Sequence, residues 1–377
     1  MSEPRVLFDA TAVPADRRGV GRYVDSLLPE LDRAGTPLHI ACRVEDVEHY
    51  AALCPGAQVL AAPRAIARRP VRMVWEQTGF PALIARQDVD VVHSPHYTRP
   101  VLSRKPSVVT LHDATFFSHP EVHERSKRLL FGAWSKASLR LADACIVPSA
   151  ATRDELVKYA GAKPDRVDVV HLGVDTSVFH EPDADSVRRV RDRLGIGDRR
   201  YIAFLGTIEP RKNLPQLVRA MALLAERRAD VPVLVLAGGS GWDTTVDDAI
   251  AAAPGVDVRK PGFLPLDELA AYLGDAELVA YPSLGEGFGL PVIEAMACGS
   301  AVLTTPFLSL PEVGGDVAAY SQPDAASIAA AVEELLDDPV RRADMARRGV
   351  QRARQFSWEA AAAAHQRIYR QVARTRT

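Results

Sequence analysis

Residues 278–299 read LVAYPSLGEGFGLPVIEAMACG and contain one complete repeating unit of the fold. The run 278–282 is apolar and predicts a buried β-strand. A glycine-rich turn follows it, and residues 290–298 have the composition of a buried helix, with Pro291 near the start, where proline is tolerated. A strand, a tight turn and a helix in this order form the element from which parallel α/β sheets are assembled.

The same unit recurs along the rest of the chain. Short apolar runs alternate with longer helical patterns, which predicts parallel βαβ units. The predicted strands of the first half are residues 5–10, 38–43, 89–94, 107–113, 144–149 and 167–172. Those of the second half are residues 201–206, 233–237, 257–259, 278–282, 301–304 and 317–320. Predicted helices between them include residues 23–34, 217–228 and 290–298.

A polar stretch at residues 180–200 interrupts this alternation. We interpret it as a linker with room for a short helix, so we expect an N-terminal domain at residues 1–180 and a second domain at 181–355. Residues 356–377 are predicted to form a C-terminal helix that packs back toward the N-terminal domain, with Ser357 capping its start. The predicted fold class is therefore α/β, with two Rossmann-like, doubly wound parallel-sheet domains.

Composition restricts the class of protein. The 377 residues are too many for one ordinary domain, and 47% apolar with 25% charged residues is typical of a well-packed globular chain. The formal net charge of −2 gives no global attraction to nucleic acid, so no nucleic-acid partner is expected. The four cysteines lie far apart without a Cys-x-x-Cys pair, which argues against a zinc site and fits a reducing cytosol.

No apolar run approaches the about 20 residues that a membrane-spanning helix needs, and the N-terminus lacks a signal-peptide core. We therefore expect a cytoplasmic protein that could rest peripherally on the cytoplasmic face of a membrane. The stretch between Arg64 and Trp75 is a candidate for contact with an anionic membrane, because four arginines alternate there with apolar residues. The alternative is a solvated loop followed by a core helix.

Motifs for two large classes of nucleotide cofactor are absent. The Gly19-Val20-Gly21 loop after the first strand is followed by Val24, where the dinucleotide fingerprint needs glycine or alanine. No Gly-x-x-x-x-Gly-Lys-Ser/Thr loop occurs in the chain. The glycines are suited to close backbone approach to a phosphate, but not to NAD or a P-loop nucleotide, and no cofactor is expected.

Two carboxylates flank the glycine-rich turn of residues 278–299. With Glu286 in the loop and Glu294 in the helix, both can face one elongated ligand. Backbone amides at such a helix start can bind an anion or sugar hydroxyls. The alternative is an ordinary strand–turn–helix with two solvated glutamates.

Two adjacent cations follow the first predicted strand of the second half. Arg211 and Lys212 come after Gly206 at the carboxyl end of strand 201–206, which is the edge where ligands bind in such sheets. Fixed cations there would stabilise the negative charge that develops on a departing phosphate. An Arg-Lys pair alone is equally typical of solvated surface.

A histidine and an aspartate end the strand predicted at residues 107–113. His112 can be a structural hydrogen-bonding group, and an acid–base or binding role is the other possibility. Phe116 and Phe117 follow shortly after, and they are suited either to line a binding surface or to join the core.

Taken together, these stretches resemble glycosyltransferase family 4, a large retaining family with the GT-B fold, in which two Rossmann-like domains face each other across a cleft. Residues 286–299 are similar to the two-glutamate motif of that family, and the Arg211-Lys212 loop is similar to its phosphate-binding loop. Residues 18–23 and His112-Asp113 match further motifs. The resemblance covers essentially the whole chain and is closest in style to bacterial mannosyltransferase-like members.

The resemblance implies roles for these residues. Glu286 would hold hydroxyls of the donor sugar, Glu294 the nucleotide ribose, and the two cations the donor diphosphate in place of a metal. The implied donor-binding residues are Gly19, Gly21, Gly206, Arg211, Lys212, Glu286, Gly287, Phe288, Gly289, Leu290 and Glu294. The implied catalytic residues are His112, Glu286, Arg211 and Lys212, and those assigned to the acceptor side are Asp113, Phe116 and Phe117. His112 would contact the transferred sugar.

The activity implied is transfer of a hexose from a nucleotide diphosphate sugar to a glycan, lipid-linked or small-molecule acceptor, with retention of anomeric configuration. GDP-mannose is favoured as the donor, and glucose is the second hexose considered. No carboxylate is placed for nucleophilic attack, so we expect front-face transfer, in which the leaving diphosphate helps to take the acceptor's proton. Two alternatives remain open: a nucleotide-sugar epimerase of the same fold, and a non-catalytic sugar-nucleotide-binding partner.

Overall fold

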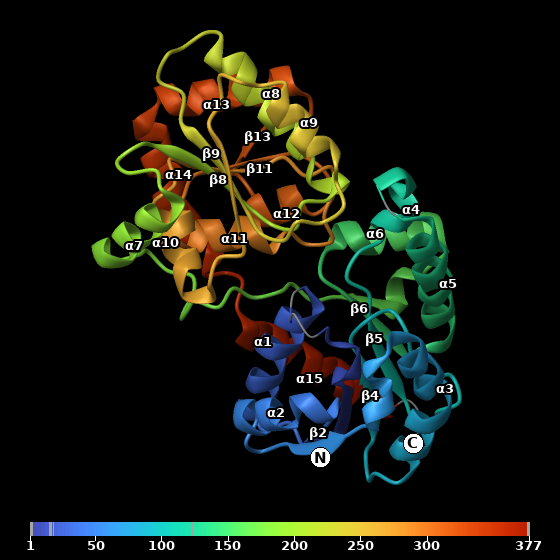
Figure 1. Cartoon of the computed structure of the whole chain (residues 1–377). Helices are drawn as coiled ribbons and strands as arrows, with labels where there is room; N and C mark the ends of the chain where they lie inside the picture. Colours follow the sequence, from blue (N-terminus) through green and yellow to red (C-terminus); the bar gives the residue numbers. More distant parts are fainter. Residues whose placement is uncertain (1–2, 15–16, 18, 123, 375–377) are drawn as a thin grey trace. The chain divides into compact units, whose positions relative to one another are not determined.

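The computed structural model describes residues 3–14, 17, 19–122 and 124–374 (Figure 1). Arg18, in the glycine loop singled out above, lies outside these residues. The chain forms two compact units. Unit 1 contains residues 1–173 together with 357–377, and unit 2 contains residues 174–356. The chain therefore passes between the units after residues 173 and 356, where the sequence analysis expected boundaries after 180 and 355.

Unit 1 is built on a seven-stranded sheet in the order β3-β2-β1-β4-β5-β6-β7. Every pairing between neighbours is parallel. The strands are β1 (Val6–Asp9), β2 (Leu38–Cys42), β3 (Gln58–Ala61), β4 (Val91–Ser94), β5 (Ser107–Thr110), β6 (Ala144–Val147) and β7 (Val167–Val169). The order reverses between β1 and β4, which is the point where ligands bind in doubly wound sheets.

Helices cover both faces of this sheet (Figure 1). They are α1 (Val20–Arg33), α2 (Val47–Leu53), α3 (Arg69–Ala85), α4 (Thr115–Ser118), α5 (Arg125–Leu141), α6 (Ala150–Ala160) and α15 (Trp358–Arg374). Right-handed crossovers place α1 and α2 on one face and α3, α5 and α6 on the other. Helix α15 packs against α1, β4 and β5, so the C-terminal helix lies in unit 1.

Burial explains why the strands of unit 1 are apolar at nearly every position. Val6, Leu7 and Phe8 of β1 are all fully buried, because alternate side chains point to opposite faces and each face is covered by helices. Helix α1 contributes a buried stripe that includes Leu27 and Leu31. The resulting core on both sides of the sheet holds the strand ends, and hence the loops that follow them, in fixed positions.

Unit 2 repeats this architecture with a six-stranded parallel sheet in the order β10-β9-β8-β11-β12-β13. The strands are β8 (Tyr201–Leu205), β9 (Val233–Ala237), β10 (Val258–Gly262), β11 (Leu278–Tyr281), β12 (Val302–Thr304) and β13 (Ala319–Tyr320). The helices are α7 (Ala184–Leu194), α8 (Leu214–Ala225), α9 (Thr245–Ala251), α10 (Leu269–Gly274), α11 (Leu290–Ala297), α12 (Leu310–Gly314), α13 (Ala325–Asp337) and α14 (Pro339–Ala353).

The predicted α/β class with two parallel-sheet domains is confirmed. Each predicted strand corresponds to an observed one, and Ser357 caps α15 by accepting a hydrogen bond from Ala360 N at 3.1 Å, as expected. One strand was missed: β3 (Gln58–Ala61) is an edge strand with two exposed residues, so it lacks the apolar signal of the covered strands. The expected linker contains helix α7, which is 11 residues or about three turns long and is capped by Asp183.

Within the described residues, no helix combines the length and the apolar character needed to cross a bilayer.

Candidate functional site

The candidate site of unit 2 lies where the strand order reverses. β8 and β11 are hydrogen-bonded neighbours, although they are far apart in sequence, and the chain leaves them for helices at the same edge of the sheet. The loop after β8 carries Arg211 and Lys212 in a 3₁₀ turn (Pro210–Lys212), and the loop after β11 carries Glu286. The parallel sheet thus brings together two motifs that are about seventy residues apart in the sequence.

Glu286 is the centre of this cluster and is buried. Its Oε1 accepts hydrogen bonds from Lys212 Nζ at 2.6 Å, from Ser283 Oγ at 2.6 Å and from Tyr281 OH at 3.0 Å. Its Oε2 accepts from Arg211 Nη1. Four neighbours therefore fix this carboxylate in one orientation.

Arg211 and Lys212 are held as tightly as the carboxylate. Arg211 Nη1 donates to the Gly285 carbonyl at 2.8 Å, and its Nη2 donates to Glu209 Oε1 at 2.6 Å. Lys212 is buried and lies 4.8 Å from the centre of the Tyr281 ring, whose hydroxyl also bonds its ammonium group. Two cations and two carboxylates thus occupy one small volume at the sheet edge.

The electrostatics of the cluster keep Glu286 ionised. Burial alone would raise its pKa, but the charges of Arg211 and Lys212 outweigh that effect and hold the pKa at about 2. Burial and the neighbouring Arg211 charge lower the pKa of Lys212, while Glu286 opposes that change. A carboxylate that stays ionised accepts hydrogen bonds and cannot donate them, so it is suited to bind hydroxyl groups.

The start of α11 supplies backbone donors beside Glu286. Gly289 precedes the helix with φ of 100°, and no side chain caps the first turn. This backbone conformation favours glycine, and a Cβ atom at Gly289 would lie 3.0 Å from Leu310 Cδ2, which would have to shift to make room. Amides at such a helix start can bind hydroxyls or anions. Glu294 lies further along α11 and is 1% exposed.

The loops after β8 and β9 approach each other through their backbones. A Cβ atom at Gly238 would lie 2.1 Å from the carbonyl oxygen of Gly206, which leaves no space for a side chain. Ile208 N donates to Gly239 O at 2.9 Å and continues this backbone contact. These glycines therefore fix the position of the loop that ends in Arg211 and Lys212.

In unit 1, His112 follows β5 at the carboxyl edge of the sheet. Its Nε2 lies 2.6 Å from the carbonyl oxygen of Pro95, which follows β4. A carbonyl only accepts, so Nε2 carries the proton and Nδ1 presents a lone pair. Burial lowers the pKa of His112, although the Pro95 hydrogen bond and the charge of Asp113 act in the opposite direction. The ring is therefore neutral at neutral pH. The Tyr23 ring packs edge-on against it at 5.0 Å.

The other residues expected near His112 divide between surface and core. Asp113 accepts from Thr115 N at 3.3 Å and Thr115 Oγ1 at 3.2 Å, and its own amide donates to the Tyr97 hydroxyl at 3.0 Å. Phe116 belongs to the hydrophobic core cluster of this edge. Phe117 is half-buried against that cluster. Of the two phenylalanines, only Phe117 thus combines core packing with partial exposure.

The glycine loop after β1 precedes α1. Gly19 has φ of 53° and caps the helix without a side-chain hydrogen bond, and a Cβ atom at Gly21 would lie 3.1 Å from Arg17 Cβ. Arg17 is bound at 2.7 Å to Asp25 and at 2.8 Å to Asp46, so its charge is already neutralised by carboxylates. Among the described residues of this segment, Arg17 is therefore held by carboxylates, and the glycines contribute backbone.

A buried polar network lies behind His112. His93 bonds Tyr369 OH at 2.6 Å and Thr110 Oγ1 at 2.8 Å, and Tyr23 OH bonds Thr110 Oγ1 at 3.1 Å and His365 Nε2 at 2.8 Å. Burial lowers the pKa of His365 to about 4. The network connects α15 with α1, β4 and β5, and it holds the Tyr23 ring that contacts His112.

A second acidic group lies at the same edge of unit 1. Glu76 of α3 is 1% exposed and lies 3.2 Å from Arg72 Nη1, and burial followed by the charge of Asp9 raises its pKa to about 7. Asp9 ends β1, is buried, and accepts from Thr11 at 2.6 Å, and burial also raises its pKa. Sequence analysis did not single out Asp9 or Glu76.

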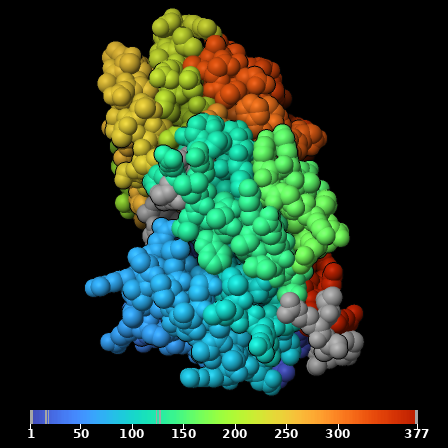
Figure 2. Space-filling view, turned by 90° about the vertical axis from the view of Figure 1, so that its right-hand side faces the viewer, coloured from blue at the N-terminus to red at the C-terminus, as the bar shows by residue number. Residues whose placement is uncertain are grey.

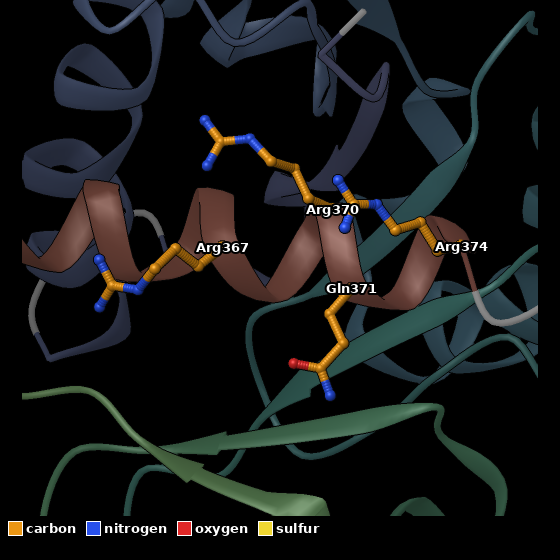
Figure 3. A pocket seen from close by; sticks show the side chains of 4 residues that line it. All are labelled: Arg367, Arg370, Gln371 and Arg374. Carbon is orange, nitrogen blue, oxygen red and sulfur yellow. The ribbon is translucent and has the colours of Figure 1, made fainter. Parts of the chain in front are cut away.

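An open pocket elsewhere in unit 1 runs along α15 and is lined by Arg367, Arg370, Gln371 and Arg374 (Figure 3). Arg370 binds Glu3 at 2.7 Å. Because Glu3 precedes β1, this pocket lies toward the amino ends of the strands, opposite to the edge that carries Asp9 and His112. It is therefore separate from the candidate ligand edge.

Sequence analysis also missed three members of the Glu286 cluster. Glu209 pairs with Arg211, while Tyr281 and Ser283 bind the Glu286 carboxylate. The only sequence signal for them was their position at or just after a predicted strand end. Among the described residues, no group of three or more His, Cys, Asp or Glu side chains is arranged to hold a metal ion. All four cysteines are buried and unbonded to one another.

Family models match both parts of the chain. The model described as Glycosyltransferase Family 4 matches residues 17–178, and the model described as Glycosyl transferases group 1 matches residues 186–353. The first match contains the His112 edge of unit 1, and the second contains the Arg211, Lys212 and Glu286 cluster of unit 2.

Curated relatives are glycosyltransferases. O-antigen chain mannosyltransferase B of Escherichia coli is 31% identical over 273 residues, which cover 71% of each chain. A D-inositol 3-phosphate glycosyltransferase of Corynebacterium aurimucosum is 35% identical over 241 residues, which cover 60% of this chain and 56% of that protein. D-inositol 3-phosphate glycosyltransferase 1 of Catenulispora acidiphila is 28% identical over 395 residues, covering 97% and 94% of the two chains.

Solved structures share the fold along the whole chain. Sucrose-phosphate synthase of Thermosynechococcus elongatus has a TM-score of 0.79 at 23% identity and covers 99% of this chain and 100% of that one. HepE of Anabaena, solved in complex with UDP-glucose, has a TM-score of 0.74 at 17% identity and covers 99% of each chain. At these identities the likeness concerns the fold, which is that of GT-B glycosyltransferases.

Matches of family models to both units, a mannosyltransferase relative that aligns over most of its own length, and two parallel α/β sheets of GT-B type lead to one conclusion. The chain is a glycosyltransferase and belongs to glycosyltransferase family 4.

Proposed function

We propose that this enzyme transfers a hexose, with mannose favoured, from a nucleotide diphosphate sugar to a glycan, lipid-linked or small-molecule acceptor, and that it retains the anomeric configuration. The observation that carries the proposal is the cluster of Arg211, Lys212 and Glu286 at the switch point of unit 2. It combines two cations suited to a diphosphate with a carboxylate that is ionised at neutral pH and suited to sugar hydroxyls.

The two cations are proposed to bind the donor diphosphate. In the structure, the carboxylates of Glu209 and Glu286 neutralise them. The diphosphate of a nucleotide sugar carries two negative charges, as many as these two carboxylates together, and it presents several acceptor oxygens, so it would compete for the same donors. As the glycosidic bond breaks, charge grows on the leaving diphosphate, and buried cations stabilise that charge strongly. We therefore expect the reaction to proceed without a divalent metal.

Glu286 and the start of α11 are proposed to bind the sugar. The Glu286 carboxylate would accept hydrogen bonds from two hydroxyls, and the amides near Gly287, Phe288, Gly289 and Leu290 would donate to oxygens of the donor. Glu294, on the same helix, is proposed to hold the ribose. Gly19, Gly21 and Gly206 are proposed to allow close backbone approach to the diphosphate.

His112 is proposed to contact the transferred sugar from unit 1. Because its Nε2 proton is donated to Pro95, its Nδ1 would accept a hydrogen bond from a sugar hydroxyl. Asp113 and Phe117 are proposed to border the acceptor, while Phe116 would support them from the core. The transfer is proposed to need no attack by an enzyme carboxylate on the anomeric carbon: the leaving diphosphate takes the acceptor's proton on the same face of the sugar.

The sugar and nucleotide are proposed from relatives. The E. coli relative is named a mannosyltransferase, which favours GDP-mannose. HepE was solved with UDP-glucose, which makes that donor the second candidate.

The test is release of nucleoside diphosphate from GDP-mannose, UDP-glucose and UDP-N-acetylglucosamine, with thermal shifts recorded in parallel. One donor should give release, with or without EDTA, and should raise the melting temperature. Both effects should disappear in Glu286→Ala and Arg211→Ala but persist in Arg227→Ala, which removes an exposed arginine of unit 2. NMR of the product should show the donor's anomeric configuration. An inverted product, or release that EDTA abolishes, would contradict the corresponding part of the proposal.

A further inference from the structure

One face of unit 1 carries a concentration of exposed apolar side chains. Of the eleven large hydrophobic residues that are exposed among the described part of the chain, six lie on α3, on the segment 99–105 or on α5. They are Val71, Val74, Val101, Leu102, Leu129 and Leu141. Val74 is 64% exposed and Leu102 is 69% exposed. Side chains this open are not part of a core, so the face has an apolar character that folding does not explain.

The same segments are strongly basic. Residues 64–86, 99–105 and 125–141 together contain thirteen Lys or Arg and one Asp or Glu, although the whole chain has a net charge of −2. The single acid is Glu76, which is buried beside Arg72. Among the cations, Arg68, Arg69 and Arg140 are exposed. The field outside this face is therefore positive, in contrast to the chain as a whole.

Hydrogen bonds join the three segments into one surface. Gln77 of α3 donates to the Arg99 carbonyl at 3.0 Å and accepts from Val101 N at 3.0 Å. Arg99 in turn donates to the carbonyl oxygen of Leu141, at the end of α5. Figure 2 shows this side of unit 1, where α3 in blue, the segment 99–105 in cyan and α5 in turquoise form a continuous surface. We call it the α3–α5 face.

Helical spacing turns the basic and apolar residues outward together. On α3 the exposed positions include Val71, Val74 and Thr78, which follow one stripe of the helix. On α5 they include Arg125 and Leu129, one turn apart. Aliphatic side chains among arginines are suited to the interface of an anionic bilayer, where the apolar groups enter the acyl boundary and the cations meet phosphates. A nucleic acid would use the charges but would not favour exposed leucine and valine.

We infer that the α3–α5 face docks on an anionic membrane surface, with Val74 and Leu102 entering the bilayer and Arg68, Arg69 and Arg140 contacting lipid phosphates. The inference rests on surface charge and exposure and is independent of the donor proposed above. It would bring unit 1 to a membrane-bound acceptor.

The structure also revises which residues of the 64–75 stretch can take part. Ile66 is 2% exposed, Trp75 packs on Phe80 at 5.2 Å between ring centres, and Arg72 is engaged by Glu76. These three side chains face the protein. The stretch therefore contributes its exposed residues to a wider face, most of which lies outside it.

Flotation of the full chain with vesicles tests the inference. We compare vesicles of phosphatidylcholine alone with vesicles of phosphatidylcholine and phosphatidylglycerol in equal parts. The protein should float only with the anionic vesicles. Arg68→Glu/Arg69→Glu and Val74→Ser/Leu102→Ser should each weaken partitioning about tenfold or more. The matched controls, Arg219→Glu/Arg354→Glu and Val340→Ser, change exposed residues of unit 2 and should leave partitioning unchanged.

A fluorescent probe separates insertion from charge attraction. All four native cysteines are buried, so Leu102→Cys provides a single exposed thiol for an environment-sensitive dye, with Val340→Cys as the control. Anionic vesicles should shift the emission to the blue at residue 102 only. No flotation in low salt, or flotation unaffected by the paired variants, would overturn the inference. Binding that depends on the arginines but not on Val74 and Leu102, with no dye shift, would also overturn it and would indicate a polyanion such as nucleic acid.

Discussion

Each unit places a buried glutamate beside an arginine at the carboxyl edge of its sheet, yet the two carboxyl groups behave in opposite ways. Glu286 has a pKa of about 2, whereas Glu76 has a pKa of about 7. Glu286 meets two cations and two hydroxyl donors, while Glu76 meets one arginine, the Thr98 side chain and the nearby Asp9 carboxyl group. Burial acts against ionisation at both sites, so the number of cations and donors decides which carboxyl stays charged.

The largest expected effect comes from neutralising Glu286. Glu286→Gln leaves the buried Lys212 and the half-buried Arg211 without their shared anion, and we expect the free energy of unfolding to fall by about 3–5 kcal/mol. Denaturant unfolding of the variant measures this, with Glu333→Gln as a control for a partly exposed carboxylate paired to Arg227. An equal loss of unfolding free energy in both variants would show that the Glu286 cluster contributes no more to stability than the Glu333–Arg227 ion pair.

Removing one cation should damage catalysis more than folding. Lys212→Met keeps a long apolar stem in the buried position and removes the charge, so we expect kcat/KM to fall by about 10²–10³ as the leaving diphosphate loses one donor. Stability should change little, because Arg211 still binds Glu286. Steady-state kinetics and thermal unfolding of the same preparation check both parts. A variant with normal kcat/KM would exclude Lys212 from the donor site.

The Glu76 site predicts a pH-dependent stability. Its pKa is raised in the folded protein from the ordinary 4.5 to about 7, so its contribution is complete below about pH 4.5 and is lost as the pH rises through 7. Relative to Glu76→Gln, the wild type should lose about 2–3 kcal/mol between pH 5 and pH 8. Unfolding curves of both proteins across this range give the difference. Parallel pH profiles would show that Arg72 keeps Glu76 ionised throughout.

The smallest expected effect concerns the network behind His112. Tyr23→Phe removes the hydroxyl that bonds Thr110 and His365, and we expect a loss of about 1–2 kcal/mol in unfolding free energy. Because the Tyr23 ring remains against His112, kcat/KM should stay within a few fold of wild type. Tyr369→Phe offers a matched change on the other side of the network. A large kinetic defect in Tyr23→Phe alone would mean that the hydroxyl positions His112.

The fold was predictable because covered parallel strands are apolar at nearly every residue, as in β1 and β9. Convergence of Arg211, Lys212 and Glu286 was also predictable, because carboxyl ends of parallel strands share an edge. The ion pair between Glu209 and Arg211 was not predictable, since nothing in the sequence indicates that this carboxylate turns toward the arginine. The partner of His112, Pro95, directly follows the neighbouring strand β4, so this contact becomes visible only once β4 and β5 pair.

Differences in burial account for the other features of the structure that the sequence did not predict. The sequence of α3 is as compatible with an exposed glutamate at position 76 as with a buried one. Only the fold shows that Glu76 is covered. Phe116 and Phe117 are adjacent in sequence, yet only the structure separates the core side chain from the half-exposed one. Sequence patterns therefore located the ligand-binding edges of the two sheets. The charge states of Glu286 and Glu76 could be inferred only from the packed structure.

The position of α15 has a consequence for synthesis. This helix completes unit 1 through His365, Tyr369 and Gln366, but the ribosome makes it only after all of unit 2. Until then, the surfaces of α1, β4 and β5 that α15 covers remain open to solvent. Unit 2 is a single continuous stretch of chain and can close as soon as it has emerged. The part that is translated first is therefore expected to finish folding last, and a chaperone would be needed mainly during that interval.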